Sequence, residues 1–317
     1  MREIAVLGGG GFIGNHLVNK LKNEGNTVIA VDLEHPKYNK SKADQFIIAD
    51  LRDQQFVSSF FNLHSFDEVY QLAADMGGAG FIFTGENDAD IMHNSVQINI
   101  NILEVLKLTK TKLFYSSSAC IYPEENQLDP QNPNCEESSA FPANPDSEYG
   151  WEKLFSERLY LSYARNYGLD VRIARFHNIY GPEGTFSGGR EKVPAAICRK
   201  VALAYDDDTI EVWGSGNQTR SFLYIDECLI GVEKLMQSDC IIPLNIGSDE
   251  MISINDLTKM VIKLSQKKLT IKNIDGPVGV NGRCSNNKLI SQSLNWQPNY
   301  PLQKGMEILY NWVNSQV

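Results

Sequence analysis

A run of glycines after the first apolar segment constrains the fold of this chain more than any other feature. Glu3–Leu7 has the composition of a short buried strand, and Gly8, Gly11 and Gly14 follow it as Gly-x-x-Gly-x-x-Gly before an amphipathic helical segment. In a strand–turn–helix unit, such glycines permit a tight turn, close approach of the backbone to a pyrophosphate, and close packing of helix on strand. The pattern therefore predicts a dinucleotide-binding unit at the N-terminus.

The residues after the glycines indicate which dinucleotide would bind. Phe12 and Ile13 open the predicted helix, where N–H groups and the positive end of the helix dipole meet a phosphate. A second strand, Thr27–Asp32, ends in a carboxylate about 20 residues after the glycines. The carboxylate of Asp32 suits the two ribose hydroxyls of NAD and would repel a 2′-phosphate. NAD is therefore the predicted cofactor.

Further strands extend this unit into a sheet. Gln45–Ala49 is a third strand, and Asp50 and Leu51 follow it as candidates for the adenine end of the cofactor. Asp50 can meet the adenine edge or cap the next helix, and the pattern leaves both open. The alternation of strands and helices through residue 120 predicts an α/β fold with a doubly wound parallel sheet. We expect an NAD-binding domain over residues 1–177 and a smaller mixed α/β substrate lobe over 178–317 that revisits the sheet.

Composition and charge exclude several classes of function. The chain has 317 residues, 42% hydrophobic and 21% charged, with a net charge of −10. Nucleic acids and anionic membranes need a positive field, so neither is an expected partner. Six cysteines lack Cys-x-x-Cys and metal-ligand spacing, which predicts reduced thiols, no metal site and a cytoplasmic location. The sequence has no signal segment and no apolar run of about 18 residues, so we expect that the protein is neither secreted nor membrane-spanning.

Small and nucleophilic side chains gather where a later strand ends. Lys112–Tyr115 is a buried strand, so Ser116–Cys120 lie at its carboxyl end, where ligands collect in open α/β sheets. Downstream, Tyr149 and Lys153 share one face of a helix. Lys153 with a nicotinamide ribose can lower the pKa of Tyr149 from about 10 toward neutrality and make it a base. Such a pair is common by chance on ordinary helices, but its position here favours catalysis. The polar, Pro-rich stretch 124–146 is predicted to be a surface loop that closes near the site.

An anionic substrate would need a local cluster of cations in this acidic chain. Lys192, Lys200, Arg220 and Arg283 can converge on a diphosphate, although any one of them alone would be a solvated surface charge. His177 invites a catalytic role, but a histidine in such a setting is more often structural, and we favour that interpretation.

With these residues assembled, the sequence resembles extended short-chain dehydrogenases/reductases acting on nucleotide sugars, and among them the epimerases that invert a GDP-hexose at C3 and C5. The resemblance covers nearly the whole chain and implies a Rossmann sheet with a smaller C-terminal lobe, NAD, a GDP-sugar substrate and a homodimer. Besides the glycine motif, Asp32 and the Tyr149–Lys153 pair, the segments that carry it are Ala73–Gly78, Ser117–Pro123, Arg175–Pro182, Gly188–Lys192, Gln218–Phe222 and Asn245–Met251.

The resemblance also implies residue roles. Tyr149, supported by Lys153 and Ser118, takes the proton of the sugar C4 hydroxyl while hydride passes to NAD, and the resulting 4-ketone acidifies the hydrogens at C3 and C5. Cys120 then matches the base and Lys192 the acid that invert these centres. The positions implied to bind the GDP-sugar are Gly78, Ser118, Ala119, Cys120, Asn178, Glu191, Lys192, Lys200, Gln218, Arg220 and Arg283.

Several alternatives stay open. Composition alone favours Cys120 as a small buried thiol, and the match around it, with Lys192 present, reverses that preference. The resemblance weakens over Gly85–Asp90 and Glu124–Glu136, and Asn286 stands where an acid is expected. GDP-mannose therefore leads, ahead of a deoxy or heptose substrate, a single-centre epimerase, or a C4 dehydrogenase. A non-catalytic dinucleotide sensor is the remaining alternative, but it has no use for these acid and base groups.

Overall fold

The computed structural model describes residues 1–317, and its centre is a seven-stranded parallel sheet. The spatial order is β11-β6-β5-β4-β1-β2-β3, so the order reverses beside β1 and a crevice opens at the carboxyl ends of the strands there. This is the doubly wound sheet predicted from the sequence. The strands are β1 (Glu3–Leu7), β2 (Thr27–Asp32), β3 (Gln45–Ile48), β4 (Glu68–Gln71), β5 (Lys112–Ser118), β6 (Val171–Phe176) and β11 (Leu244–Ile246).

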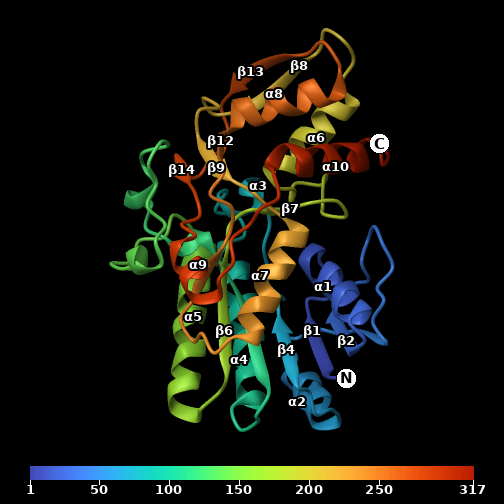
Figure 1. The fold of residues 1–317 in the computed structure, drawn as a ribbon, viewed down its shortest axis with the longest axis vertical. Coiled ribbons are helices and arrows are strands. Elements are labelled where there is room, and N and C mark those ends of the chain that lie inside the picture. The colour runs from blue at the N-terminus through green and yellow to red at the C-terminus, as the bar shows by residue number, and fades with distance from the viewer.

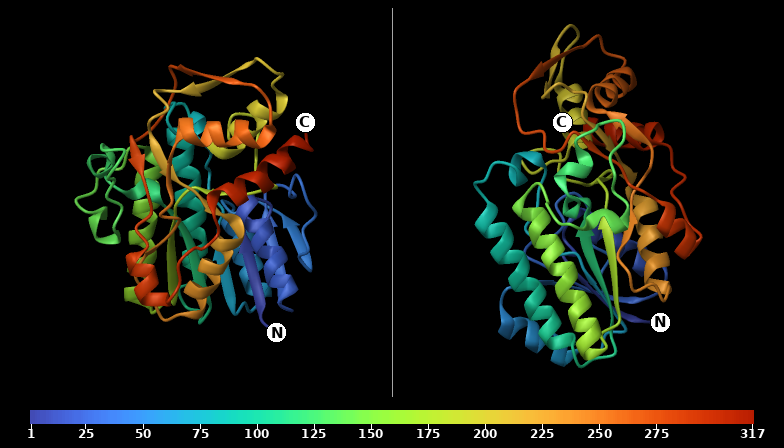
Figure 2. Two further views of the ribbon diagram at one scale, coloured as in Figure 1. Left: turned by 45° about the horizontal axis from the view of Figure 1, so that its top comes forward. Right: turned by 90° about the vertical axis from the view of Figure 1, so that its left-hand side faces the viewer.

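Helices cover both faces of the sheet, as Figures 1 and 2 show. Alternate side chains of β1 explain the two layers: Ile4 and Val6 join one apolar cluster and Ala5 and Leu7 the other. One face carries α1 (Phe12–Asn23) and α7 (Ile225–Gln237), and the other carries α2 (Gln54–Leu63), α4 (Asp88–Leu106) and α5 (Glu148–Tyr167). None of the helices combines the length and the apolar composition that a membrane span requires.

A second group of elements lies above the carboxyl ends of the strands (Figure 1). Three of its helices pack on one another: α6 (Val193–Leu203), α8 (Ile254–Ser265) and α10 (Leu302–Asn314). Its short strands are β7 (Ile179–Tyr180) with β10 (Leu223–Tyr224), β8 (Thr209–Trp213) with β13 (Thr270–Ile274), and β12 (Met251–Ser253), β9 (Thr219–Ser221) and β14 (Gly282–Arg283) in one small sheet. The remaining short helices are α3 (Ala79–Ile82), α9 (Lys288–Leu294), and the 3-10 turns η1 (Ala119–Ile121), η2 (Glu124–Gln127) and η3 (Glu137–Ala140).

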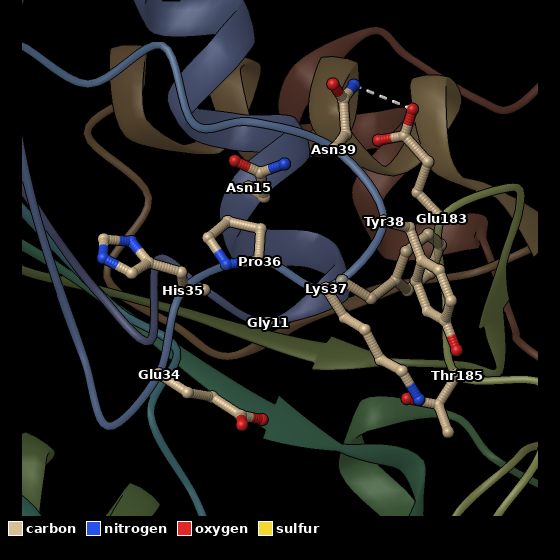
Figure 3. A pocket seen from close by; sticks show the side chains of 12 residues that line it. Gly11, Asn15, Glu34, His35, Pro36, Lys37, Tyr38, Asn39, Glu183 and Thr185 are labelled. Atoms are coloured by element: carbon tan, nitrogen blue, oxygen red, sulfur yellow. Dashed lines mark hydrogen bonds between the residues drawn. The ribbon is translucent and has the colours of Figure 1, made fainter.

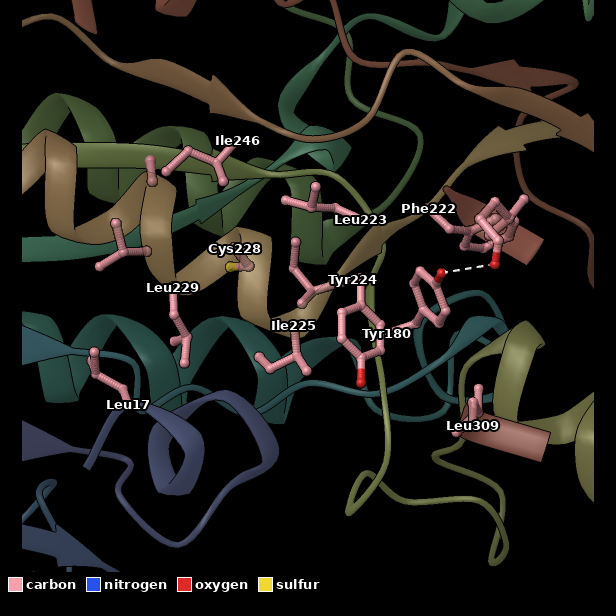
Figure 4. Packing of buried hydrophobic residues seen from close by; sticks show 14 of the residues in the cluster. Leu17, Tyr180, Phe222, Leu223, Tyr224, Ile225, Cys228, Leu229, Ile246 and Leu309 are labelled. Carbon is pink, nitrogen blue, oxygen red and sulfur yellow. Dashed lines mark hydrogen bonds between the residues drawn. The ribbon is translucent and has the colours of Figure 1, made fainter. Parts of the chain in front are cut away.

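One continuous apolar core joins the two parts. A cluster of 39 buried residues runs from one face of the sheet into the C-terminal helices. Figure 4 shows the cluster passing from Leu17 of α1 through Leu229 of α7 to Tyr180 of β7, and on to Leu309 of α10. Residues beyond 178 also supply α7 and the edge strand β11, which pairs with β6. The boundary at residues 177 and 178 stays a prediction, because the packing is continuous across it.

The structure refines two local expectations. The stretch 124–146, expected as a surface loop, is largely exposed or half-buried, but it also contributes to a small core in which Cys135 and Ala140 pack with Tyr122 and Leu154. Its apolar residues are too few and too irregularly spaced to be recognised as core in the sequence. Asp50 does not cap the next helix, because Asp53 accepts the N–H groups of Gln55 and Phe56 at the start of α2.

Candidate active site

The glycine turn after β1 has the geometry of a phosphate cradle. Gly8 adopts φ +85°, and a Cβ at Gly14 would lie 2.0 Å from the carbonyl oxygen of Gly8, so helix and turn approach as closely as only glycine permits. Phe12 and Ile13 open α1, whose first turn contains no acidic residue. The free N–H groups and the helix dipole therefore meet the crevice without a competing carboxylate, as a pyrophosphate requires.

Asp32 and Asp50 stand at the ends of neighbouring strands. The carboxylate of Asp32 accepts hydrogen bonds from the backbone N of Gly10 at 2.8 Å and of Leu33 at 2.7 Å. Burial raises the pKa of Asp32, although these N–H groups act in the opposite direction. Asp50 pairs with Arg52 at 2.6 Å, and that guanidinium lowers the pKa of Asp50. Leu51, which stands between Asp50 and Arg52 in the sequence, is buried. The arrangement fits the ribose and adenine end of NAD.

A cavity of about 120 Å³ continues from the glycine turn to the segment after β2 (Figure 3). Gly11 forms one wall, Lys37 and Tyr38 another, and Glu183 and Thr185 from the C-terminal half a third. The cavity thus lies beside the Asp32 end of the predicted cofactor site.

Tyr149 and Lys153 lie on the buried face of α5, which Ser147 caps through the backbone N of Gly150. The ammonium of Lys153 donates to the carbonyl oxygen of Ser116 at 3.0 Å and lies 5.8 Å from the Tyr149 ring centroid. Burial raises the pKa of Tyr149, with Ser118 acting in the opposite direction, and burial lowers the pKa of Lys153. The surroundings in the chain thus oppose ionisation of Tyr149, and a cationic cofactor ring would favour it.

Close packing of α5 on η1 brings Cys120 to Tyr149. A Cβ at Gly150 would lie 2.2 Å from the carbonyl oxygen of Cys120, so this approach needs glycine. Ser118 ends β5, and its hydroxyl accepts a hydrogen bond from the backbone N of Cys120 at 3.2 Å, while Ala119 is buried beside it. Ser118, Cys120 and Tyr149 therefore share one end of the crevice, as predicted from the sequence.

Arg283 reaches Cys120 from the far end of the chain. Its Nη1 donates to the Sγ of Cys120 at 3.0 Å, its Nε to Gln127 Oε1 at 2.6 Å, and its Nη2 to Asp146 Oδ2 at 3.3 Å. Burial opposes the charge on Arg283, yet the sulfur of Cys120 and the carboxylate of Asp146 raise its pKa. The guanidinium of Arg283 therefore lies directly against the sulfur of Cys120.

Lys192 joins this group from the start of α6. Burial lowers the pKa of Lys192, while the sulfur of Cys120 acts in the opposite direction. The loop at Gly78 lies beside this segment, because the Gly78 N donates to the carbonyl oxygen of Arg190 at 3.1 Å. Glu191 accepts the backbone N of Gly189 at 2.6 Å and orders the same turn.

The remaining predicted substrate residues fall into two groups. Arg220 and Arg283 are register partners on β9 and β14, and burial, followed by the charge of Arg283, lowers the pKa of Arg220 to about 10. Lys200 instead donates to the carbonyl oxygen of Glu211 at 2.6 Å, so it does not join Arg220 and Arg283 in this structure. The amides of Gln218 and Asn178 likewise donate to backbone oxygens, those of Trp213 at 2.8 Å and Ser221 at 2.9 Å.

Sequence reasoning missed three buried partners of the site. Gln127 and Asp146 hold Arg283, and both lie in the stretch expected as a surface loop, where no local signal marks them. Glu152, next to Lys153, is fully buried and accepts hydrogen bonds from Ser156 at 2.7 Å and Asn99 at 3.3 Å. The spacing of residues 149, 152, 153 and 156 on one helix face was the signal that could have found it.

His177 occupies a structural position. It is fully buried, and its Nε2 donates to the Oδ1 of Asn245 at 2.9 Å, while its Nδ1 has no partner in the chain. Burial lowers the pKa of His177 to about 3, since a proton there would be desolvated and lie near Arg283 and Arg175.

We expect His177 to make the fold sensitive to acid. Its pKa is about 6.5 in the unfolded chain and about 3 in the fold, so the unfolded state binds more protons between these values. Stability therefore falls as pH drops below 6.5, and the loss reaches about 2 kcal/mol at pH 5. Urea unfolding at pH 7 and pH 5 measures it. His177→Gln should lose correspondingly less between the two pH values, and an equal loss in both proteins would contradict the assignment.

Comparisons with known proteins agree with this geometry. Residues 4–247 match the model of the NAD dependent epimerase/dehydratase family. GDP-mannose 3,5-epimerase of Arabidopsis thaliana is 46% identical over 318 residues, which cover 99% of this chain and 83% of that protein. GDP-mannose 3,5-epimerase 1 of Oryza sativa subsp. indica is 45% identical over 99% of this chain and 82% of its own length. The crystal structure of UDP-glucuronic acid 4-epimerase from Bacillus cereus with UDP-glucuronic acid and NAD has a TM-score of 0.84 at 26% identity, covering 99% of this chain and 100% of that one.

Proposed function

The chain belongs to the NAD dependent epimerase/dehydratase family, and from this premise we propose that it inverts a GDP-hexose at C3 and C5, with GDP-mannose as the substrate. The observation that carries the proposal is the group formed by Cys120, Arg283 and Lys192 beside Tyr149. An enzyme that only oxidises C4 needs Tyr149 and NAD but has no use for a thiol and an ammonium. Double inversion needs both.

The first step is proton transfer from the sugar to Tyr149. The glycine turn and Asp32 would hold NAD, which would supply the hydride acceptor and donor for C4 of the sugar. Tyr149 takes the proton of the C4 hydroxyl, and Ser118, which acts to lower the pKa of Tyr149, helps to orient the phenol. Lys153, anchored on the Ser116 carbonyl oxygen, lies beneath and supplies positive charge. The 4-keto sugar that results has acidic hydrogens at C3 and C5.

The second step exchanges protons on opposite faces of the ring. Cys120, whose sulfur accepts a hydrogen bond from Arg283, abstracts a proton from C3 or C5. Lys192 returns a proton from the other face, and the lowered pKa of this buried ammonium makes it a better donor. When C4 is reduced again, Tyr149 returns its proton to the C4 oxygen, which restores both the hydroxyl and the base. The cofactor would end the cycle oxidised, so no net NADH accumulates.

The rest of the crevice would hold the GDP moiety. We assign the diphosphate to Arg220 and Arg283, which are register partners on β9 and β14. Arg220 now donates to three backbone oxygens and Arg283 to Cys120, Gln127 and Asp146, so both guanidiniums would have to share these acceptors. We assign the remaining contacts to the positions that carry the resemblance, which are Gly78, Ala119, Asn178, Glu191, Lys200 and Gln218. Lys200, Gln218 and Asn178 would have to release or share their present backbone acceptors.

We further infer that two chains associate through α4 and α5. These helices pack side by side on the outer face of the sheet (Figure 2) and leave apolar side chains exposed: Ile100 at 37%, Trp151 at 39% and Phe155 at 48%. Four such helices packing across a two-fold axis would cover them. The six free cysteines support a reducing, cytoplasmic setting for this dimer.

Proton NMR of GDP-mannose incubated with the enzyme and NAD in D2O tests the proposed reaction. We expect the C3 and C5 protons to exchange for deuterium, because the catalytic acid and base exchange their own protons with the solvent. The C4 proton should be retained, because the same hydride returns. UDP-glucose should show no exchange.

Each outcome has a distinct meaning. Exchange at C5 alone would narrow the reaction to one centre. Intact GDP-mannose without exchange would contradict the assignment of GDP-mannose as the substrate, while the assignment of the family and its cofactor would stand.

Lys192→Met should separate exchange from inversion. Cys120 can still remove a proton and return it to the same face, so deuterium should enter C3 and C5 of recovered GDP-mannose. Without the ammonium on the opposite face, we expect epimer formation to fall roughly 10³-fold. NMR integration of substrate and product reports both quantities. Loss of exchange together with inversion, in a variant that still oxidises C4, would assign Lys192 to the abstraction step instead.

A further inference from the structure

The segment after β2 crosses from the sheet to the C-terminal half of the chain. Residues Glu34–Asn39 form one wall of the 120 Å³ cavity, and the glycine turn and Glu183 form its other sides (Figure 3). This segment follows Asp32 directly, so it continues from the predicted ribose site toward the cradle for the pyrophosphate. We call Glu34–Asn39 the strap.

Two contacts fasten the strap to distant parts of the chain. The Nδ2 of Asn39 donates to Glu183 Oε1 at 2.9 Å, the contact marked in Figure 3. The ring of Tyr38 packs 5.5 Å from Phe186 and 5.2 Å from Trp312 of α10, measured between centroids. Glu183 itself has φ +66°, a conformation that a glutamate rarely adopts unless its surroundings hold it there. These contacts therefore tie the strap to the C-terminal half of the molecule beside the cavity.

The polar groups of the strap suit a phosphate-bearing ligand. Lys37 is the one lysine that lines the cavity, and it faces the same space as Gly10 and Gly11 of the glycine turn. The hydroxyl of Tyr38 is buried without a hydrogen-bond partner in the chain, which is uncommon in folded proteins. An ammonium and an unpaired hydroxyl beside a helix N-terminus are the groups that the oxygens of a diphosphate or a ribose accept from.

We propose that the strap is a clasp that retains NAD, in which Lys37 and Tyr38 bind the ribose–pyrophosphate part of the cofactor and the contact between Asn39 and Glu183 holds the clasp shut. The reaction gives this a reason: an enzyme that regenerates NAD in every cycle has no need to exchange it. The inference rests on the cofactor of the family and not on the identity of the sugar. Release of NAD would then require the strap to part from Glu183.

The rate at which bound NAD leaves the holoenzyme tests the clasp. Enzyme loaded with radiolabelled NAD is mixed with a large excess of unlabelled NAD, and the label retained on the protein is followed over time. Asn39→Asp places two carboxylates against each other and removes a hydrogen bond to a charged group, so release should accelerate about tenfold or more. Asn39→Asp with Glu183→Gln restores a donor–acceptor pair in the opposite sense and should return release toward the original rate.

Two further variants complete the test. Lys37→Met should accelerate the release of NAD while leaving the contact between Asn39 and Glu183 in place. It replaces Asn39→Asp as the test if that variant does not fold. Lys40→Ala is the matched control, because Lys40 adjoins the strap but does not line the cavity, and its release rate should be unchanged. Unaltered release in both Asn39→Asp and Lys37→Met would overturn the clasp. The measurement contains no sugar, so this failure is distinct from a failure of the proposed epimerisation.

Discussion

Replacing Cys120 with alanine is expected to stop deuterium incorporation at C3 and C5 of GDP-mannose while oxidation at C4 continues. The thiol is the group next to Arg283 that can remove a carbon-bound proton, and alanine has no ionisable atom. Loss of a general base lowers a rate by about 10²–10⁴-fold, so exchange should fall roughly 10³-fold. Proton NMR in D2O measures the exchange.

The fold should tolerate this change, because Arg283 keeps its bonds to Gln127 and Asp146. A transient absorbance of reduced cofactor at about 340 nm on mixing with substrate would show that C4 is still oxidised. Cys240→Ala is the matched control, since Cys240 is a free, half-buried thiol that bonds only its own turn, and it should exchange normally. Persistent exchange in the Cys120 variant would assign the base to another group.

Tyr149→Phe should stop the reaction one step earlier. Without the phenol no group takes the proton of the C4 hydroxyl, so neither the transient reduced cofactor nor exchange at C3 and C5 should be seen. The expected fall is again roughly 10³-fold, and stopped-flow absorbance with NMR measures it. Phenylalanine fills the same buried space between α5 and the crevice, so the fold and NAD binding should survive.

Tyr163→Phe supplies the control on the same helix. Its hydroxyl bonds Glu104 at the exposed side of α5 and α4, away from the crevice, and its loss should leave the rates unchanged. The two catalytic variants also test each other: the Cys120 variant oxidises without exchange, whereas the Tyr149 variant does neither. Exchange in the Tyr149 variant would contradict a 4-keto intermediate made with this tyrosine.

Much of the cofactor site could be predicted because its signals are local. The glycines that cradle a phosphate and the strand ending at Asp32 lie within one strand–helix–strand unit, so their spacing alone specifies the geometry. Tyr149 and Lys153 share a helix face for the same reason. The burial of β1 on both faces could be predicted from its unbroken apolar run, Ile4–Leu7.

The surroundings of the catalytic groups could not be predicted in this way. The acid-rich stretch 124–146 is exposed by composition, yet it folds inward and gives Gln127 and Asp146 to Arg283. Asp146 favours the charge on Arg283. The pKa values of Tyr149 and Lys192 move mainly because both groups are buried, and burial is decided by the tertiary packing. Lys200, predicted with the cations, is instead held by the backbone of β8.

The sequence by itself determined the doubly wound fold and the predicted NAD site, because these depend on periodicity and short-range spacing, whereas Cys120 and Lys192 became the base and acid candidates only through the resemblance to a family. Only the tertiary structure decided that Cys120 meets Arg283 across 163 positions of the chain, and that Asn39 meets Glu183 across 144. Such contacts follow from the packing of the C-terminal half on the crevice, and no local pattern encodes which distant side chain will arrive there.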